Sequence, residues 1–156
     1  MAYKILSPAR LREILKKRRG KTIVFTNGCF DILHIGHVKY LKAAKSKGDI
    51  LIVGLNADRS VRRLKGPSRP LTPQNERAQI LAALECVDFV VLFNEDTPER
   101  LIRMLQPDVL VKGGDWPLDK IVGADIVRAK KGRVLAIPYV KNRSTTGLIH
   151  KILKLG

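Results

Sequence analysis

The chain has 156 residues, of which 45% are hydrophobic, enough for one domain with a sizeable core. No apolar run approaches the roughly 18 residues that span a membrane, and the start lacks a signal-peptide core, so we expect one cytoplasmic domain (residues 1–156) and no membrane partner. Thirty Lys and Arg against fourteen Asp and Glu give a formal charge of +16, which suits anionic partners such as nucleotides, sugar phosphates, nucleic acid or acidic lipids.

Helical and extended patterns alternate along the chain. The first 21 residues contain eight Lys and Arg and a single acidic residue, Glu13, and the pattern after Ser7-Pro8 predicts a basic amphipathic helix that ends near Gly20. The remaining sequence predicts strands at 22–26, 49–55, 88–93, 109–111 and 134–140, and helices that begin after residues 37, 72, 97 and 144 or cover 124–130. The basic helix either contacts an anion or is a solvated face, and its charge does not separate the two.

Strands that alternate with helices predict a single-domain, doubly wound (Rossmann-like) parallel α/β sheet with helices on both faces. In such sheets ligands bind at the C-terminal ends of the strands, near the point where the strand order reverses. Three unusual stretches follow predicted strands and fall at this edge, at residues 26–37, 112–116 and 143–146. We therefore expect a catalytic core over residues 22–156, preceded by the basic helix of residues 1–21.

The junction at residues 26–37 joins the first strand to a helix and carries His34 and His37 on either side of Gly36. A helix N-terminus offers unpaired N–H groups and a positive dipole end, and a glycine lets a phosphate approach the backbone. The two imidazoles, one turn apart, would then reach the same group. Metal ligation is an alternative, but zinc usually takes three or four protein ligands and only Asp31 lies nearby. A pair of structural histidines is the other alternative.

Several other signatures are missing from the sequence. There is no Gly-x-x-x-x-Gly-Lys-Ser/Thr loop, no Gly-x-Gly-x-x-Gly after the first strand and no Gly-x-Ser-x-Gly elbow. A P-loop kinase and an ordinary dinucleotide dehydrogenase are therefore poor fits. Cys29 and Cys86 are far apart without metal-like spacing, so we expect reduced structural thiols.

The motif Gly28-x-Phe30-Asp31-x-x-His34-x-Gly36-His37 resembles the signature of the nucleotidyltransferase superfamily, which includes cytidylyltransferases and class I aminoacyl-tRNA synthetases. Residues 113–116 are similar to the Gly-Asp-Asp-Trp region of glycerol-phosphate cytidylyltransferases, and residues 143–146 look like a shortened form of their Arg-Thr-Glu-Gly-Ile-Ser-Thr-Thr motif. Over residues 26–153, loops included, the chain more closely resembles the adenylyltransferase half of the bifunctional ADP-heptose synthesis proteins. The stretches that carry this resemblance are 26–31, 63–70, 76–78, 111–115 and 143–146.

The resemblance implies an enzyme that converts ATP and D-glycero-β-D-manno-heptose 1-phosphate to ADP-heptose and pyrophosphate, for lipopolysaccharide or related surface glycans. A separate heptose-7-phosphate kinase would supply the substrate, and a homodimer is expected because relatives in the superfamily often form one. Catalysis is assigned to His34, His37 and Lys65. Nucleotide binding is assigned to Thr26, Asn27, Gly28, Phe30, Asp31, Gly36, Arg77, Gly114, Asp115, Ser144, Thr145 and Thr146, and sugar-phosphate binding to Arg69, Lys112, Trp116 and Arg143.

Nucleotidyl transfer to a sugar phosphate requires alignment of the two substrates and neutralisation of their phosphate charges more than it requires proton transfer. A sugar phosphate is already ionised at neutral pH, so its oxygen can attack the α-phosphorus without a general base. The histidines would hydrogen-bond the α-phosphate, and Mg²⁺ would be bridged by the ATP phosphates without a protein-only metal site. Asp31 could instead cap the helix, and Arg77 could be a surface ion-pair partner.

Two rival functions are open at this stage. One is a cytidylyltransferase for glycerol phosphate or a similar alcohol phosphate, because base choice does not follow from motif spacing. The other is a basic nucleic-acid-binding module, which would explain the net charge. A synthetase fragment would share the histidine motif, but the second, lysine-rich signature of those enzymes is absent, so nucleic acid is not the expected partner.

Overall fold

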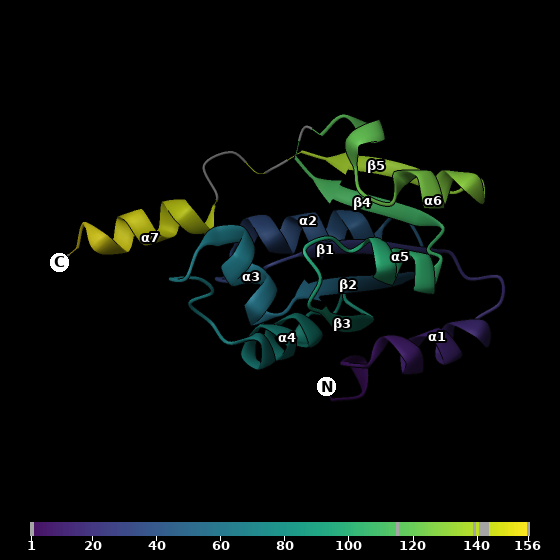
Figure 1. The fold of residues 1–156 in the computed structure, drawn as a ribbon, viewed down its shortest axis with the longest axis horizontal. Coiled ribbons are helices and arrows are strands. Elements are labelled where there is room, and N and C mark those ends of the chain that lie inside the picture. Colours follow the sequence, from purple (N-terminus) through teal and green to yellow (C-terminus); the bar gives the residue numbers. More distant parts are fainter. Residues whose placement is uncertain (1, 115, 139, 141–143, 156) are drawn as a thin grey trace.

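The computed structural model describes residues 2–114, 116–138, 140 and 144–155 (Figure 1). The strands are β1 (Ile23–Gly28), β2 (Ile50–Asn56), β3 (Phe89–Phe93), β4 (Val109–Gly113) and β5 (Arg133–Ile137). The helices are α1 (Pro8–Lys16), α2 (Ile35–Lys45), α3 (Asp58–Lys65), α4 (Gln74–Ala83), α5 (Glu99–Leu105), α6 (Ala124–Ala129) and α7 (Thr145–Leu153), with short 3-10 turns η1 (Ala2–Lys4) and η2 (Leu118–Lys120). Two expected site residues, Asp115 and Arg143, lie outside the described residues.

The strands form one five-stranded sheet in the order β3-β2-β1-β4-β5, and their pairings are parallel. In the central strand β1, Ile23 is paired with Ile50 of β2, and Val24 is paired with Val109 of β4. The chain first winds outward through β2 and β3 and then in the other direction through β4 and β5. The order therefore reverses between β1 and β4, where a doubly wound sheet opens a crevice at its carboxyl edge. The predicted doubly wound parallel fold is confirmed.

Helices cover both faces of the sheet and divide the core in two. On one face Leu11 of α1, Ile102 of α5 and Val127 of α6 are fully buried. On the other face the buried residues include Leu41 of α2 and Leu81 of α4. All seven residues of β2 are buried, as expected for an apolar parallel strand covered on both sides. This two-sided packing leaves only the edges of the sheet open to a ligand.

The basic N-terminal segment packs against the rest of the domain. Ser7 caps α1, which contacts α5, and the N–H of Leu6 donates to the carbonyl of Val90 in β3 at 3.0 Å. The helix ends at Lys16, earlier than the sequence predicted, and Gly20 with a φ of +78° lies in the turn that leads into β1. The charged residues after Lys16 therefore lie in a turn at the start of the sheet.

Helix α7 has no buried residue and extends away from the sheet, as the yellow helix in Figure 1 shows. Its N-cap, Ser144, accepts the N–H of Gly147 at 3.0 Å. The hydroxyl of Thr145 donates to the carbonyl of Ile32 at 3.5 Å, which ties the start of this helix to the histidine junction. Within the described part of the chain, no helix has both the length and the apolar character needed to cross a bilayer.

Candidate active site

The two histidines form a capping pair at the start of α2. His34 is the N-cap residue, and its Nδ1 accepts the N–H of Gly36 at 3.1 Å. Its own N–H donates to Nδ1 of His37 at 3.4 Å, so each ring binds a backbone donor of the first turn. The rings stack with their centroids 3.8 Å apart and their planes at 25°. The local sequence thus fixes both imidazoles at a helix N-terminus, where an anion is favoured.

This capping pattern also fixes how the rings are protonated. Because Nδ1 of each neutral ring is an acceptor, the proton of each imidazole is on Nε2, which makes Nε2 of both His34 and His37 a donor. The pKa of His37 is lowered to about 4 by burial and, secondarily, by the neighbouring His34 and the charge of Lys65. The edge of the Phe30 ring contacts the same imidazole, with the centroids 5.2 Å apart. His37 is therefore a neutral hydrogen-bond donor at physiological pH.

Asp31 supports a neighbouring loop through its buried carboxylate. It accepts the N–H groups of Leu71 and Thr72 at 2.8 and 2.9 Å and Nε of Arg69 at 2.5 Å. Burial alone would raise the pKa of Asp31, but the two backbone donors and the guanidinium outweigh it and lower the pKa. The side chain is only 1% exposed. In this structure the oxygens of Asp31 bind the loop that carries Arg69, and a contact between Asp31 and nucleotide or Mg²⁺ stays a prediction.

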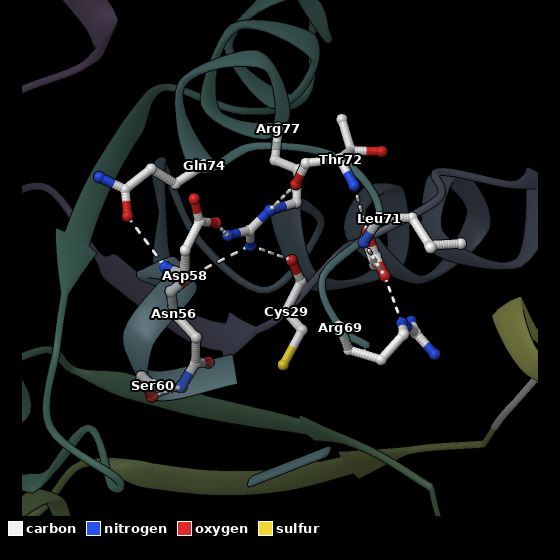
Figure 2. A network of polar contacts seen from close by, with 10 residues as sticks. Cys29, Asn56, Asp58, Ser60, Arg69, Leu71, Thr72, Gln74 and Arg77 are labelled. Carbon is white, nitrogen blue, oxygen red and sulfur yellow. Dashed lines mark hydrogen bonds and ion pairs between the residues drawn. The ribbon is translucent and has the colours of Figure 1, made fainter. Parts of the chain in front are cut away.

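Arg77 lies at the centre of a second network (Figure 2). Its residue exposure is 1%, and its guanidinium donates to four oxygens: the carbonyls of Cys29, Asn56 and Thr72 and the carboxylate of Asp58, at 2.5 to 3.0 Å. These partners come from the end of β1, the end of β2, the start of α3 and the loop before α4. A side chain buried among these acceptors is not a surface ion-pair partner, which corrects that alternative, whereas phosphate binding by Arg77 stays a prediction. It joins the strand ends that carry the site.

Three polar or cationic side chains surround the crevice between β1 and β4. Lys65 is exposed at the end of α3, and its positive charge acts to lower the pKa of both His37 and Cys29. Lys112 lies near the end of β4, and burial lowers its pKa. Burial also raises the pKa of the Cys29 thiol, although Lys65 opposes the shift. The expected neutral thiol at this position fits these surroundings, and the lysines supply positive charge on two sides of the crevice.

Thr26 has a structural role in the same crevice. It is fully buried, and its hydroxyl shares a 2.6 Å hydrogen bond with the phenol of Tyr40, which also donates to the carbonyl of Val111 at 3.3 Å. This chain of contacts joins β1, α2 and β4 where the strand order reverses. The hydroxyl of Thr26 is thus bound within the protein, and the nucleotide contact of Thr26 stays a prediction. Tyr40, which the sequence did not single out, lies three residues after His37 and hence on the same side of α2.

A family model for cytidylyltransferase-like proteins matches residues 25–149. The chain belongs to the cytidylyltransferase-like family. It is 59% identical over 153 residues to the bifunctional protein HldE of Syntrophotalea carbinolica, covering 94% of this chain and 31% of that protein. It is 62% identical over 139 residues to the bifunctional protein HldE of Geobacter metallireducens, covering 89% of this chain and 28% of that protein. The resemblance noted in the sequence is thereby confirmed, and the chain spans about three tenths of the length of these curated relatives.

A solved structure supports the same family. The crystal structure of a lipopolysaccharide core biosynthesis protein from Thermoplasma volcanium is similar, with a TM-score of 0.62 and 30% sequence identity. The match covers 80% of this chain and all of that protein. The Rossmann-like nucleotidyltransferase fold expected for this cytidylyltransferase-like domain is therefore confirmed.

The remaining predicted site residues of the cytidylyltransferase-like domain are distributed around the crevice. Asn27 and Gly28 end β1 and are partly exposed, whereas Gly36 is buried in the first turn of α2. Gly114, with a φ of +97°, donates its N–H to the carbonyl of Ile137 at 2.8 Å. The other members lie at the rim: half-exposed Trp116 and, at the start of α7, Ser144, Thr145 and Thr146. Phe30 is 7% exposed with a φ of +45°, and its ring packs against the imidazole of His37.

Crowding against the Phe30 ring explains the glycine at the end of β1. A Cβ at Gly28 would lie 2.9 Å from the Phe30 ring, so only glycine lets this ring fold back beneath the histidines.

The described residues contain no group of three or more His, Cys, Asp or Glu side chains able to hold a metal ion. The Asp31 carboxylate is bound to three donors, and Mg²⁺ bridged by the ATP phosphates stays a prediction.

Proposed function

We propose that this domain is an adenylyltransferase that converts ATP and D-glycero-β-D-manno-heptose 1-phosphate to ADP-heptose and pyrophosphate. The observation that carries the proposal is the stacked pair His34 and His37, whose Nε2–H donors lie at the helix N-terminus beside the strand-order reversal. The relatives named HldE and the lipopolysaccharide core biosynthesis protein support the choice of a sugar-phosphate substrate for surface glycans. The cytoplasmic location, the homodimer and a separate heptose-7-phosphate kinase belong to the same proposal.

The reaction is one displacement at the α-phosphorus of ATP. An oxygen of the sugar phosphate forms a bond to this phosphorus while the bond to the bridging oxygen of pyrophosphate breaks, so no proton has to be removed from the nucleophile. The neutral imidazoles of His34 and His37 donate hydrogen bonds to the α-phosphate oxygens as negative charge grows there. A neutral donor is compatible with the low pKa of His37, because donation from Nε2 does not require a protonated ring.

Cations around the crevice would neutralise the remaining phosphate charge. Lys65 lies on the α3 side and Lys112 on the β4 side. Arg69 donates Nε to Asp31, and its remaining guanidinium N–H groups would bind the sugar phosphate. Mg²⁺ bound to the ATP phosphates would supply further charge neutralisation. Asn27 and the start of α7 would complete the nucleotide pocket.

The proposal is tested by pyrophosphate release from defined substrate pairs. ATP with heptose 1-phosphate should give turnover, and its absence would contradict the proposal. Turnover only with CTP and glycerol phosphate would instead establish the cytidylyltransferase. Salt-sensitive binding of RNA or DNA without any pyrophosphate release would favour the nucleic-acid module.

Variants test the role of the histidines. His34→Ala and His37→Ala should each lower kcat about 10²- to 10³-fold, the usual effect of losing a donor to a developing oxyanion, while ATP binding persists. His150→Ala is the matched control, because this histidine is exposed on α7 and should leave kcat unchanged. Normal turnover in His37→Ala would contradict the proposed role.

A further inference from the structure

The sheet edge opposite the candidate active site is strongly basic. All strands of a parallel sheet begin at one edge, and here the C-terminal ends of α1, α2 and α6 arrive at the same edge. The residues in these ends and in the turns that follow include many exposed cations. We call them the basic edge: Lys17, Arg18, Arg19, Lys21, Lys47, Lys130, Lys131 and Arg133.

Contacts between the turns show that the basic edge is continuous. The guanidinium of Arg133, at the start of β5, donates to the carbonyl of Lys47, after the end of α2, at 2.9 Å. The carboxylate of Asp49 lies 3.8 Å from Lys21 and accepts the N–H of Thr22 at 2.8 Å. The turns after α1, after α2 and before β5 are thereby brought together. These elements come from both helical layers and from the sheet, so the charges extend across the whole thickness of the domain.

Acidic residues balance only a small part of this charge. Asp49 approaches Lys21, and Asp108 pairs with Lys130 at 3.1 Å. Eight cations against two carboxylates leave an excess of six positive charges on the basic edge. None of the other six cations forms an ion pair with a described carboxylate. Helix dipoles favour a cation in a last turn, but Arg18, Arg19 and Lys131 lie beyond the helices.

One of these cations occupies a position that suits glycine better. Lys131 follows α6 with a φ of +63°, a left-handed conformation that costs a residue with a side chain about 1 kcal/mol. Gly132, the next residue, is itself required, because a Cβ there would lie 2.6 Å from a Val127 methyl and 2.7 Å from the carbonyl of Asp108. Lys131 therefore adds positive charge to the basic edge while lowering the folding stability of the domain.

We propose that the basic edge docks this domain on an anionic lipid surface through the phosphate head groups. The eight residues of the basic edge include no aromatic side chain, and exposed large hydrophobic residues such as Trp116 and Leu155 lie elsewhere. The exposed Tyr3 lies beside the start of β3, outside these eight residues. The basic edge thus lacks the aromatic platform on which single-stranded nucleic acid stacks. Its charges spread over three layers instead of following one helix into a groove, which matches a planar array of phosphates. The contact is electrostatic and peripheral, and no segment inserts into the bilayer.

The basic edge is separate from the substrates of the proposed reaction. Strands of five to seven residues, at about 3.3 Å per residue, place it about 17 to 23 Å from the candidate active site. The phosphates of a nucleotide at the histidines therefore do not neutralise it. The proposed lipid contact does not depend on which phosphate ester the candidate active site uses. It replaces the expectation of no membrane partner by a contact with the membrane surface.

Vesicle sedimentation of the full chain tests the proposal. Vesicles of 30 mol% phosphatidylglycerol in phosphatidylcholine should bind the protein, whereas phosphatidylcholine alone should not. Binding should be lost at about 1 M salt, where the screening length is about 3 Å. Binding to both vesicle types alike would overturn the proposal. So would salt-sensitive binding to duplex RNA without binding to the acidic vesicles.

Charge variants locate the contact. The triple variant Lys17→Gln, Arg18→Gln, Arg19→Gln should weaken partitioning about 100-fold, at about fivefold per lost cation. Lys131→Gly should weaken it about fivefold while thermal stability stays equal or rises, which separates loss of charge from loss of folding. The matched control replaces three exposed cations away from the basic edge, Arg59, Lys151 and Lys154, by Gln. Equal losses in the triple variant and the control would overturn the assignment to this edge.

Discussion

Replacement of Arg77 by Met should destabilise the domain far more than the loss of a comparable surface ion pair. Breaking a buried charge pair costs about 3–5 kcal/mol, because the partner is left uncompensated. Here the Asp58 side chain is 23% exposed and is partly rehydrated in the variant, so the cost of leaving it unpaired lies at the lower end of that range. Carbonyls that lose a donor add about 1 kcal/mol or more each when buried. The methionine fills most of the vacated volume, and we expect a total loss of about 4 kcal/mol.

Urea unfolding followed by circular dichroism measures this loss, and the melting temperature should fall by about 2–4 °C per kcal/mol. Arg63→Met is the matched control. Its Nε lies 2.7 Å from Asp96, the same distance as in the Arg77–Asp58 pair, but the two side chains are 46% and 60% exposed. A surface pair of this kind contributes about 0–1 kcal/mol. The two variants differ chiefly in burial.

The result that would refute this reasoning is a loss below about 1 kcal/mol for Arg77→Met, or equal losses in both variants. Arg77→Lys separates the structural role from phosphate binding. A lysine keeps the charge but cannot reproduce four directed contacts, so stability should fall by a similar amount. Preserved stability with lost ATP binding would instead support the predicted phosphate role.

Three further predictions concern the neighbouring side chains. Because the pKa of Asp31 is lower in the folded protein, its carboxylate stabilises the fold above its ordinary pKa near 3.8, and this stabilisation is lost as the pH falls through the folded pKa. Asp31→Asn should abolish this part of the acid dependence of urea unfolding. An unchanged acid dependence in the variant would contradict the prediction. His37 should titrate near pH 4 by NMR, and stability should decline as the pH falls from about 6.5 to about 4, because the unfolded ring takes up its proton first. An ordinary titration midpoint would rule out its burial beside His34. Thr26→Val removes the 2.6 Å hydrogen bond to Tyr40 and should cost about 1 kcal/mol in urea unfolding, and a neutral result would show that the bond is dispensable.

The sheet and most helices could be predicted from the sequence because local patterns encode them. Strands such as Ile50–Asn56 are continuous apolar runs, and Ser7 with Pro8 marks a helix start. Helix α3 was not among the predicted helices, since buried Val61 is one of few apolar residues in it. The strand order could not be read in the same way, because pairing of β4 between β1 and β5 depends on contacts between distant segments.

The position of the histidines was also predictable, but the direction of several side chains was not. His34, Gly36 and His37 form a local motif whose geometry follows from the helix start. Asp31 and Arg77 belong to the same family pattern, and a pattern assigns a residue to a site without showing which neighbour it faces. Several of their partners lie between 19 and 48 residues away in the sequence, and only the folded chain brings these groups together.

The Asp31 carboxylate has a consequence for hydrogen exchange. Leu71 and Thr72 lie in a loop, yet their amides are bound to a buried acceptor, as strand amides are. Such amides exchange with solvent only when the structure around them opens. We therefore infer slow exchange for this part of the loop and faster exchange for Ser68, because Pro67 has no amide hydrogen and the amide of Gly66 donates to the carbonyl of Arg62 at 2.9 Å. Movement of the loop toward a ligand would then change the backbone angles at Gly66, which has a φ of +96°, while the far end of the loop stays bound to Asp31 in the junction between β1 and α2.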